Sequence, residues 1–468
     1  MINRDGSCLE HIEKLFKSIE SFYHPSNTDR RWHSKLQQFL YKLPACYVKR
    51  LYRERYKKNI WSRRIPESHR LTDYQTSRFV DALLPVVLTS MFNQSGVSTA
   101  ALAFRDLAVL RPEKVIPPLL ERLYGSYETL IEPHRLLASI NCMASVIPAM
   151  VRPCKYFPEG PNHVVPLLLN SLPGIDSNDM RKCIAVFRFI ATLAAHVRMK
   201  DYSYLVNDRP NLTAEEQQLC LSTSQFEDFV IQFLDKCFIL IENSTSAHTF
   251  SNPDHDAQIF RSGEEGIIEA AISSVTLSIL AQASTKIRLA ALDKLYSHVT
   301  RHLFDTKTQG QAISTLCLAC AKVQPRETLA KFVPHFGRLV LALTENEEVF
   351  QEMNLDHELT FSLLLLSEIV RCNSSHVLDH HDLIMQVLHR SLKLKSKEGY
   401  SLGCSILRHL LRALTNITCC DWRNVDFDDE RNRQIEERWP FDNWGFTTNV
   451  DDLKIRWEIP GPESREFA

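Results

Sequence analysis

The apolar residues of this chain recur at helical spacing along most of its length, and this periodicity constrains the fold more than any other feature. Segments 133–150, 178–197 and 285–304 place apolar residues three and four positions apart, a pattern that predicts amphipathic α-helices. Convincing strand alternation is found nowhere. The chain has only 13 glycines among 468 residues, whereas sheets use glycine in tight turns. The sequence therefore predicts an all-α fold.

A short proline-containing unit recurs within this pattern. Each copy places a proline after two apolar residues and continues with helical apolar spacing. The four copies are residues 83–92, 115–124, 164–173 and 332–343. Proline suits the first turn of a helix, because its φ is already helical and its missing N–H would have no partner there. We therefore expect these prolines to open helices.

The spacing of these units indicates a helical repeat. Pro85, Pro117 and Pro166 lie 32 and 49 residues apart, which brackets the roughly 40 to 47 residues of HEAT-type repeats. The chain is also too long for one core, which stops growing at about 250 to 300 residues. We predict an α-α superhelix, a HEAT/armadillo-like solenoid of helix pairs, over residues 1–420. A polar insertion is expected at about 242–266, and residues 421–468 are expected to form an acidic, tryptophan-containing irregular segment with an extended end.

Helix starts are marked by capping residues. Thr213 and Glu216 have the spacing of a capping box, in which two side chains satisfy two free amide donors. Thr72, Asp73 and Ser177 are further N-cap candidates, because their side-chain oxygens can accept a hydrogen bond from the first turn. These signals place helix starts after residues 72, 177 and 213.

Composition excludes several classes of protein. The formal net charge is −1, with 44% hydrophobic and 24% charged residues, so the chain is expected to fold and no direct contact with nucleic acid is expected. The N-terminus has no signal-peptide pattern, and no run approaches the ~20 apolar residues of a membrane span. The 13 cysteines show no disulfide framework, and most of them, such as Cys142, Cys183, Cys237 and Cys404, lie on apolar helix faces and are expected to be small buried thiols. We expect a location in the nucleus and cytoplasm, with no membrane partner.

The basic run 49–64 is the first candidate site. Only Glu54 opposes its positive charges, and Tyr52, Tyr56 and Trp61 are interleaved with them. Its cationic residues are Lys49, Arg50, Arg53, Arg55, Lys57, Lys58, Arg63 and Arg64. Such a run can bind phosphate groups while its rings stack or pack, which points to a phosphate-rich small molecule or an acidic protein surface. The alternative is a solvated helix face whose side-chain stems cover a neighbouring helix, and both interpretations remain open.

Two further clusters contain side chains that can bind metal ions. Residues 376–382 concentrate His376, Asp379, His380, His381 and Asp382. On a helix, His376 and His380 lie four apart and can reach one metal ion, although polar residues at a helix start are also ordinary. Cys317 and Cys320 lie within an apolar helix without a second pair at zinc-binding spacing, so core thiols are expected.

The sequence contains no nucleotide-binding glycine loop and no nucleophile elbow. We therefore expect neither catalysis nor a bound cofactor. These conclusions concern chemistry and leave binding functions open.

Several longer stretches carry a family resemblance. They include "FYHPSNTDRRW", "LAVLRPEKVIPPLLERLY", "FPEGPNHVVPLLLNSLPGIDSNDMRKCIAVFRFIATL" and "FEDFVIQFLDKCF". Together they resemble the large HEAT-repeat, ATP-independent proteasome activator family, and the similarity runs from about Glu10 to Trp457. The resemblance implies a giant solenoid that forms a dome on the 20S core particle, opens the gate of its α-ring without nucleotide, and admits peptides and unfolded or acetylated proteins such as histones.

The resemblance also indicates which part of the family protein this chain corresponds to, and it implies a ligand. Family members are several times longer, so the chain resembles an N-terminal to middle portion and is expected to contact the α-ring through the full-length parent. Family members end in a hydrophobic-tyrosine-any tripeptide, where this chain has Glu466 and Phe467, and their acetyl-lysine-binding region lies toward their C-terminus, beyond the part that this chain resembles. The family implies an inositol polyphosphate ligand for the basic run and a monomeric protein.

Two alternatives to a proteasome activator remain open at this point. A generic HEAT-repeat scaffold or transport receptor would use the same architecture to bind a folded cargo. A metal-dependent hydrolase would use the His376 to Asp382 cluster. The scaffold or transport receptor differs from a proteasome activator in the partner that it binds. The hydrolase would require a bound metal ion.

Overall fold

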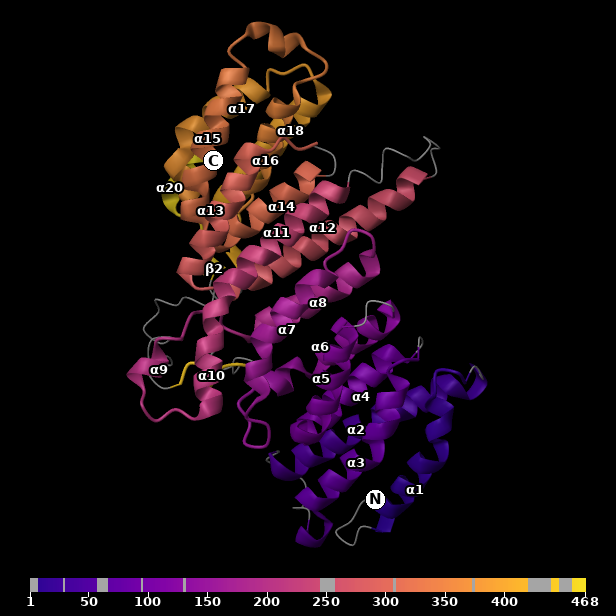
Figure 1. The fold of residues 1–468 in the computed structure, drawn as a ribbon. Coiled ribbons are helices and arrows are strands. Elements are labelled where there is room, and N and C mark those ends of the chain that lie inside the picture. The colour runs from indigo at the N-terminus through magenta and orange to yellow at the C-terminus, as the bar shows by residue number, and fades with distance from the viewer. Residues whose placement is uncertain are drawn as a thin grey trace. The chain divides into compact units, whose positions relative to one another are not determined.

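The computed structural model describes residues 7–27, 30–56, 66–93, 96–128, 132–244, 257–305, 309–372, 375–419, 439–445 and 457–468. Nearly all of these residues belong to helices (Figure 1). The chain divides into two compact units, which are described separately. Unit 1 comprises Met1–Ser171 and Phe441–Phe446, and unit 2 comprises Leu172–Pro440 and Thr447–Ala468.

Unit 1 is built of two layers of helices. One layer contains α1 (Ser7–Ile19), α3 (Asp73–Ser90) and α5 (Pro112–Glu128). The other contains α2 (Arg30–Arg55), α4 (Val97–Leu110) and α6 (Pro133–Val151). Each helix packs against the helix two positions along the chain in its own layer, and α4 also packs against α3 and α5 across the layers. The short helix α7 (Val164–Ser171) completes this unit.

Unit 2 repeats the two-layer arrangement. One layer contains α8 (Met180–His196), α12 (Ala257–Gln282), α14 (Gln309–Val323), α16 (His357–Val370) and α18 (Lys397–Thr415). The other contains α11 (Phe226–Ser244), α13 (Thr285–Arg301), α15 (Pro325–Leu343) and α17 (His381–Ser391). Packing within each layer follows chain order, and α14, for example, packs against α12 and α16.

The remaining elements of unit 2 are short. Helices α9 (Leu205–Asp208) and α10 (Ala214–Ser222) lie between α8 and α11 in the chain. Strands β1 (Thr418–Cys419) and β2 (Trp457–Glu458) form one antiparallel pair, in which Thr418 is opposite Glu458. They are the only strands among the described residues. Helix α20 (Pro462–Phe467) packs against α18.

The packing order explains the apolar stripes of the sequence. A helix that contacts neighbours on both sides of its layer and one across it must bury most of its surface. Helix α16 shows this most clearly, because every residue from Leu359 to Val370 is buried, as expected for a helix that is apolar all round. Helical pairs stacked in chain order are the architecture of a helical repeat array. The prediction of an all-α, HEAT-like solenoid of helix pairs is confirmed.

The role predicted for the recurring prolines was largely wrong. Pro85, Pro117, Pro118 and Pro334 lie inside α3, α5 and α15, and only Pro166 falls in a first turn, that of α7. An internal proline removes one hydrogen bond and strains the carbonyl four residues earlier. Tertiary packing on several sides nevertheless holds these helices together, so proline did not mark their starts. The prolines that do begin α5, α6 and α15 are Pro112, Pro133 and Pro325.

Two of the predicted helix caps are confirmed, and the other two are wrong. Thr72, and not Asp73, forms a complete capping box with Gln75 at the start of α3, and Thr213 forms one with Glu216 at the start of α10. Ser177 was the wrong residue, because the N-cap of α8 is Asp179, two positions later, whose side chain accepts a hydrogen bond from the backbone N–H of Lys182. Aspartate and serine are about equally good N-caps, so residue type alone does not distinguish them.

Helix α6 is long and apolar enough to span a membrane by length and composition, and it is the only such helix among the described residues. This was not expected from the sequence. The buried residues of α6 include Ile140, Met143 and Ile147, and the helix packs against α4 and α5. Burial within unit 1 therefore accounts for its apolar composition.

Two segments predicted to be irregular are described only in part. Of the polar segment 242–266, residues 242–244 belong to α11 and residues 257–266 to α12, and the rest lies outside the described residues. Of residues 421–468, only 439–445 and 457–468 are described. The expected extended end was wrong for Pro462–Phe467, which forms α20, because Pro462 starts a helix as readily as it interrupts one.

Candidate functional site

The basic run predicted as a polyanion site lies at the C-terminal end of α2. Lys49, Arg50, Arg53 and Arg55 belong to the last two turns of this helix. The other four predicted residues, Lys57, Lys58, Arg63 and Arg64, lie outside the described residues. Positive side chains at this end of a helix are favoured by the partial negative charge of its unpaired carbonyl groups.

Arg50 is held by contacts within the protein. Its Nε donates a 2.7 Å hydrogen bond to Oε1 of Glu54, and its Nη2 donates a 2.8 Å hydrogen bond to the backbone carbonyl of His69. The second carboxylate oxygen of Glu54 accepts a 2.8 Å hydrogen bond from the backbone N–H of Leu71. The Glu54 side chain is only 2% exposed. Arg50 and Glu54 therefore join the end of α2 to the segment that leads into α3.

Arg55 makes a similar internal contact. Its Nη2 donates a 2.8 Å hydrogen bond to the carboxylate of Asp73 in the first turn of α3. This hydrogen bond, together with the charges of Arg55 and Arg111, lowers the pKa of Asp73 although burial opposes the shift. Two of the four described cationic residues, Arg50 and Arg55, thus make contacts within the fold.

The remaining residues form an exposed face. Lys49, Tyr52, Arg53 and Tyr56 are spaced three and four apart and therefore lie on one side of α2. All four are exposed, and the rings of Tyr52 and Tyr56 lie 5.7 Å apart. Within the described ranges, neither Lys49 nor Arg53 takes part in an ion pair. We call these four residues the α2 basic face.

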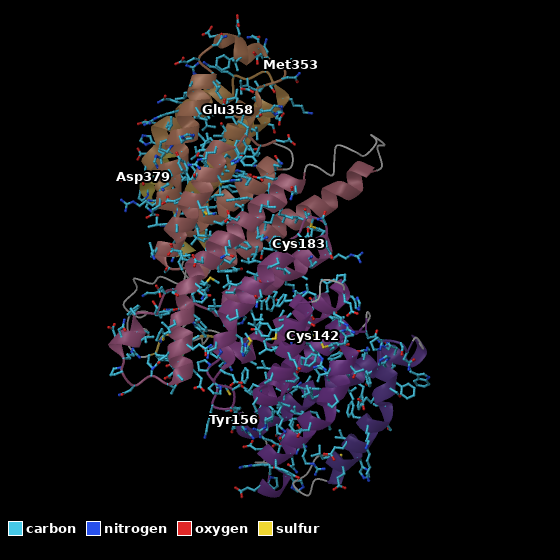
Figure 2. The ribbon with its side chains drawn as sticks, viewed as in Figure 1. Cys142, Tyr156, Cys183, Met353, Glu358 and Asp379 are labelled. Carbon is cyan, nitrogen blue, oxygen red and sulfur yellow. The ribbon has the colours of Figure 1, made fainter. Side chains whose placement is uncertain are left out.

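The predicted cluster at residues 376–382 does not have the geometry that metal binding would need. His376 and His380 lie in a 3₁₀ turn, Ser375–His380, and not in an α-helix. A 3₁₀ turn has three residues per turn, so positions four apart point in different directions. His376 instead contacts Asp379, with 3.3 Å between Nδ1 and Oδ2, and Asp379 lies at the surface of unit 2 (Figure 2). His376 and His380 therefore do not share the helical face on which the alternative of a common metal ion depended.

The prediction that Cys317 and Cys320 are core thiols is confirmed. Both are buried in α14, and burial raises the pKa of Cys317 well above its ordinary value and that of Cys320 to about 12. Cys142 and Cys183, labelled in Figure 2, are also buried, and burial raises the pKa of each to about 12. A protonated, buried thiol is neither a nucleophile nor a metal ligand.

One cluster of possible metal-binding side chains was not predicted from the sequence. Glu242, His298 and His302 bring their ligand atoms within 4.8 Å of one another. Burial and the neighbouring His302 lower the pKa of His298, against the opposing effect of Glu242. The spacing of four between the two histidines was a visible signal, but the third member is 56 positions earlier in the chain and only the packing of α11 on α13 brings it close.

Comparison with known proteins identifies the family of the chain. The family model for the mid HEAT repeats region of proteasome activator complex subunit 4 matches residues 12–468. The chain belongs to this family. Proteasome activator complex subunit 4 of Xenopus laevis is 41% identical over 461 residues, which cover 98% of this chain and 25% of the relative. The Homo sapiens protein of the same name shows the same values.

A more distant relative also matches almost the whole chain. Proteasome activator BLM10 of Saccharomyces cerevisiae is 21% identical over 500 residues, which cover 97% of the chain and 22% of the relative. The chain therefore spans about a quarter of the length of these relatives. These matches confirm the resemblance to the large proteasome activators.

Proposed function

We propose that this chain is part of a non-catalytic, ATP-independent activator of the 20S proteasome. The observation that carries the proposal is the match of residues 12–468 to the mid HEAT repeats of proteasome activator complex subunit 4. In this proposal the larger protein caps the core particle, contacts its α-ring, opens the gate and promotes degradation of peptides and of unfolded or acetylated proteins such as histones. It acts as a monomer in the nucleus and cytoplasm.

The architecture supports a role in enclosing partners. The helices bury their apolar side chains against neighbours in their own layer and in the opposite one, and the polar side chains that remain exposed on most of them are available for contacts with a partner. An array of this kind presents an extended surface whose shape is set by the stacking of its repeats. Such a surface holds a substrate or a partner without chemical transformation.

We also propose that the α2 basic face contributes to a site for a phosphate-rich ligand, an inositol polyphosphate being the expected class. Lys49 and Arg53 are positively charged and form no internal ion pair in the described part of the chain. Tyr52 and Tyr56 are 60% and 70% exposed, and their hydroxyl groups can donate hydrogen bonds to phosphate oxygens. Arg50 and Arg55 are assigned to the fold and not to the ligand.

The principal test is purification of the endogenous protein with an affinity tag introduced at its own gene. We expect 20S α-ring subunits to co-purify, and we expect the purified protein to accelerate peptide hydrolysis by 20S particles equally with and without ATP. A parallel assay compares degradation of acetylated and unacetylated histones. Co-purification of a GTPase or a phosphatase in place of proteasome subunits would instead support a generic HEAT scaffold or transport receptor.

A further inference from the structure

Three side chains with metal-binding atoms meet where α11 and α13 end. Glu242 lies near the end of α11, His298 lies in the last turn of α13, and His302 follows that helix directly. Their ligand atoms all lie within 4.8 Å of one another, and Oε1 of Glu242 is 3.7 Å from Nε2 of His298. Two helices that are adjacent in one layer of unit 2 thus converge on a single point.

The hydrogen bond made by His302 fixes its tautomer. Its Nδ1 lies 2.9 Å from the backbone carbonyl of His298. A carbonyl oxygen only accepts hydrogen bonds, so Nδ1 carries the proton and Nε2 keeps its lone pair. Donation from the second ring nitrogen to a backbone carbonyl is the usual way in which a metal-binding histidine is oriented.

His298 is positioned by packing and has a buried nitrogen without a hydrogen-bond partner. Its side chain is 12% exposed, and its ring stacks on that of Phe238 with 3.8 Å between centroids. Within the described part of the chain, Nε2 makes no hydrogen bond, and the carboxylate of Glu242 is too far away to accept one. A buried polar atom without a partner is costly, and an ion is one of the explanations for such an atom.

We propose that Glu242, His298 and His302 form a zinc site, with a water molecule as the fourth ligand. Two imidazole nitrogens and one carboxylate oxygen are a common set for Zn²⁺, which binds them at about 2.0 to 2.2 Å. Tetrahedral coordination requires the ligand atoms to approach to roughly 3.4 Å. Glu242 and His302 are exposed side chains, so small rotations about their side-chain bonds can bring the three ligand atoms this close together.

The charges around the cluster are compatible with a bound cation. Lys294 of α13 is paired at 2.7 Å with Asp235 of α11, and Arg301, the last residue of α13, is exposed to solvent. The site itself contributes the negative charge of Glu242. A zinc ion here would cross-link α11 and α13, so its role is to stabilise the stacking of two neighbouring repeats.

The test measures zinc binding to the untagged 468-residue chain after treatment with a chelator. Competition with a chromophoric zinc indicator gives the affinity and the number of ions bound, and Co²⁺ gives the visible absorption of a four-coordinate site. We expect one strongly bound ion and a higher melting temperature with zinc. His302→Ala and Glu242→Gln should each weaken binding by at least about tenfold and leave melting of the zinc-free protein unchanged.

His389→Ala is the matched control, because His389 is an exposed histidine of α17 in the same unit and should bind zinc as the wild type does. His298 is left intact because its ring is part of the packing around Phe238. Equal zinc affinity in wild type, His302→Ala and Glu242→Gln would overturn the proposal, as would the absence of binding at micromolar zinc. Neither result would bear on the proposed association with the proteasome.

Discussion

Arg111 donates a 2.7 Å hydrogen bond from Nη2 to the backbone carbonyl of Asp73, which joins the turn before α5 to the first turn of α3. The Arg111 side chain is only 10% exposed, and its guanidinium group lies 5.4 Å from the centre of the Tyr156 ring. This residue therefore connects two neighbouring helices of one layer and a later turn of unit 1.

Replacement of Arg111 by alanine is expected to destabilise the protein. The variant loses a charge-assisted hydrogen bond and the contact with Tyr156, so the free energy of unfolding should fall by about 2 to 3 kcal/mol. Urea unfolding of wild type, Arg111→Ala and Arg111→Lys measures the effect. The lysine variant keeps the positive charge but loses the planar guanidinium group with its several N–H donors. Its free energy of unfolding should therefore lie between those of wild type and Arg111→Ala. Three coincident unfolding curves would contradict the role assigned to Arg111.

Asp73 gives the protein a specific dependence on pH. Its pKa is lowered in the folded state, chiefly by the hydrogen bond from Arg55. Such a carboxyl group adds stability above its unfolded pKa, and that contribution is lost as pH falls through the lower, folded pKa. Asp73 is 63% exposed, so the contribution should stay below about 1 kcal/mol after screening by solvent.

Comparison of Asp73→Asn with wild type tests this dependence. The variant should be slightly less stable at pH 7, and the difference in the free energy of unfolding should shrink as pH falls below about 4. High salt should reduce the difference at pH 7, because the interacting charges are exposed. A difference that grew toward acid pH would contradict the assignment.

Glu54 is expected to be the most sensitive residue at the end of α2. Glu54→Ala removes the acceptor of the Leu71 backbone N–H and of the Arg50 Nε–H, while the Arg50 Nη2 keeps its hydrogen bond to the His69 carbonyl. It should lower the free energy of unfolding by about 2 kcal/mol or more. Arg53→Ala, one position earlier but exposed, is the matched control and should change it by no more than about 0.5 kcal/mol. Thermal and urea unfolding of both variants provide the measurement, and equal losses would show that Glu54 has no special role.

The fold was largely predictable because helical periodicity is a local property. Apolar stripes in single helices such as α8 and α13 can be recognised without knowledge of their neighbours. The prolines were misinterpreted for the same reason. Whether Pro85 or Pro334 begins a helix or is tolerated inside one depends on how firmly the surrounding turns are packed, and that information lies in other helices.

The sites were less predictable because their geometry depends on distant residues. The run 49–64 is strongly basic with Glu54 as its one acidic residue, yet Glu54 and Asp73 pair with Arg50 and Arg55 and leave Lys49 and Arg53 exposed. Conversely, Glu242 is far in sequence from His298 and His302, so a search for local metal-binding spacing could not assemble the three. Local patterns predicted which residues carry charge, and tertiary packing decided which of them remain available.

The α2 basic face yields a direct binding prediction. Lys49→Glu combined with Arg53→Glu should weaken binding of inositol hexakisphosphate by about tenfold at moderate salt, because each exposed ion pair contributes up to about 1 kcal/mol. Isothermal titration calorimetry at low and high salt measures the effect, and the loss should be largest at low salt. The melting temperature should not change, since neither side chain makes an internal ion pair in the described structure.

The matched control is Lys393→Glu combined with Lys397→Glu. It makes the same change of charge on exposed residues of unit 2 and should bind the ligand as the wild type does. An equal loss in both double variants would mean that the ligand responds to net charge alone and would rule out a site on α2.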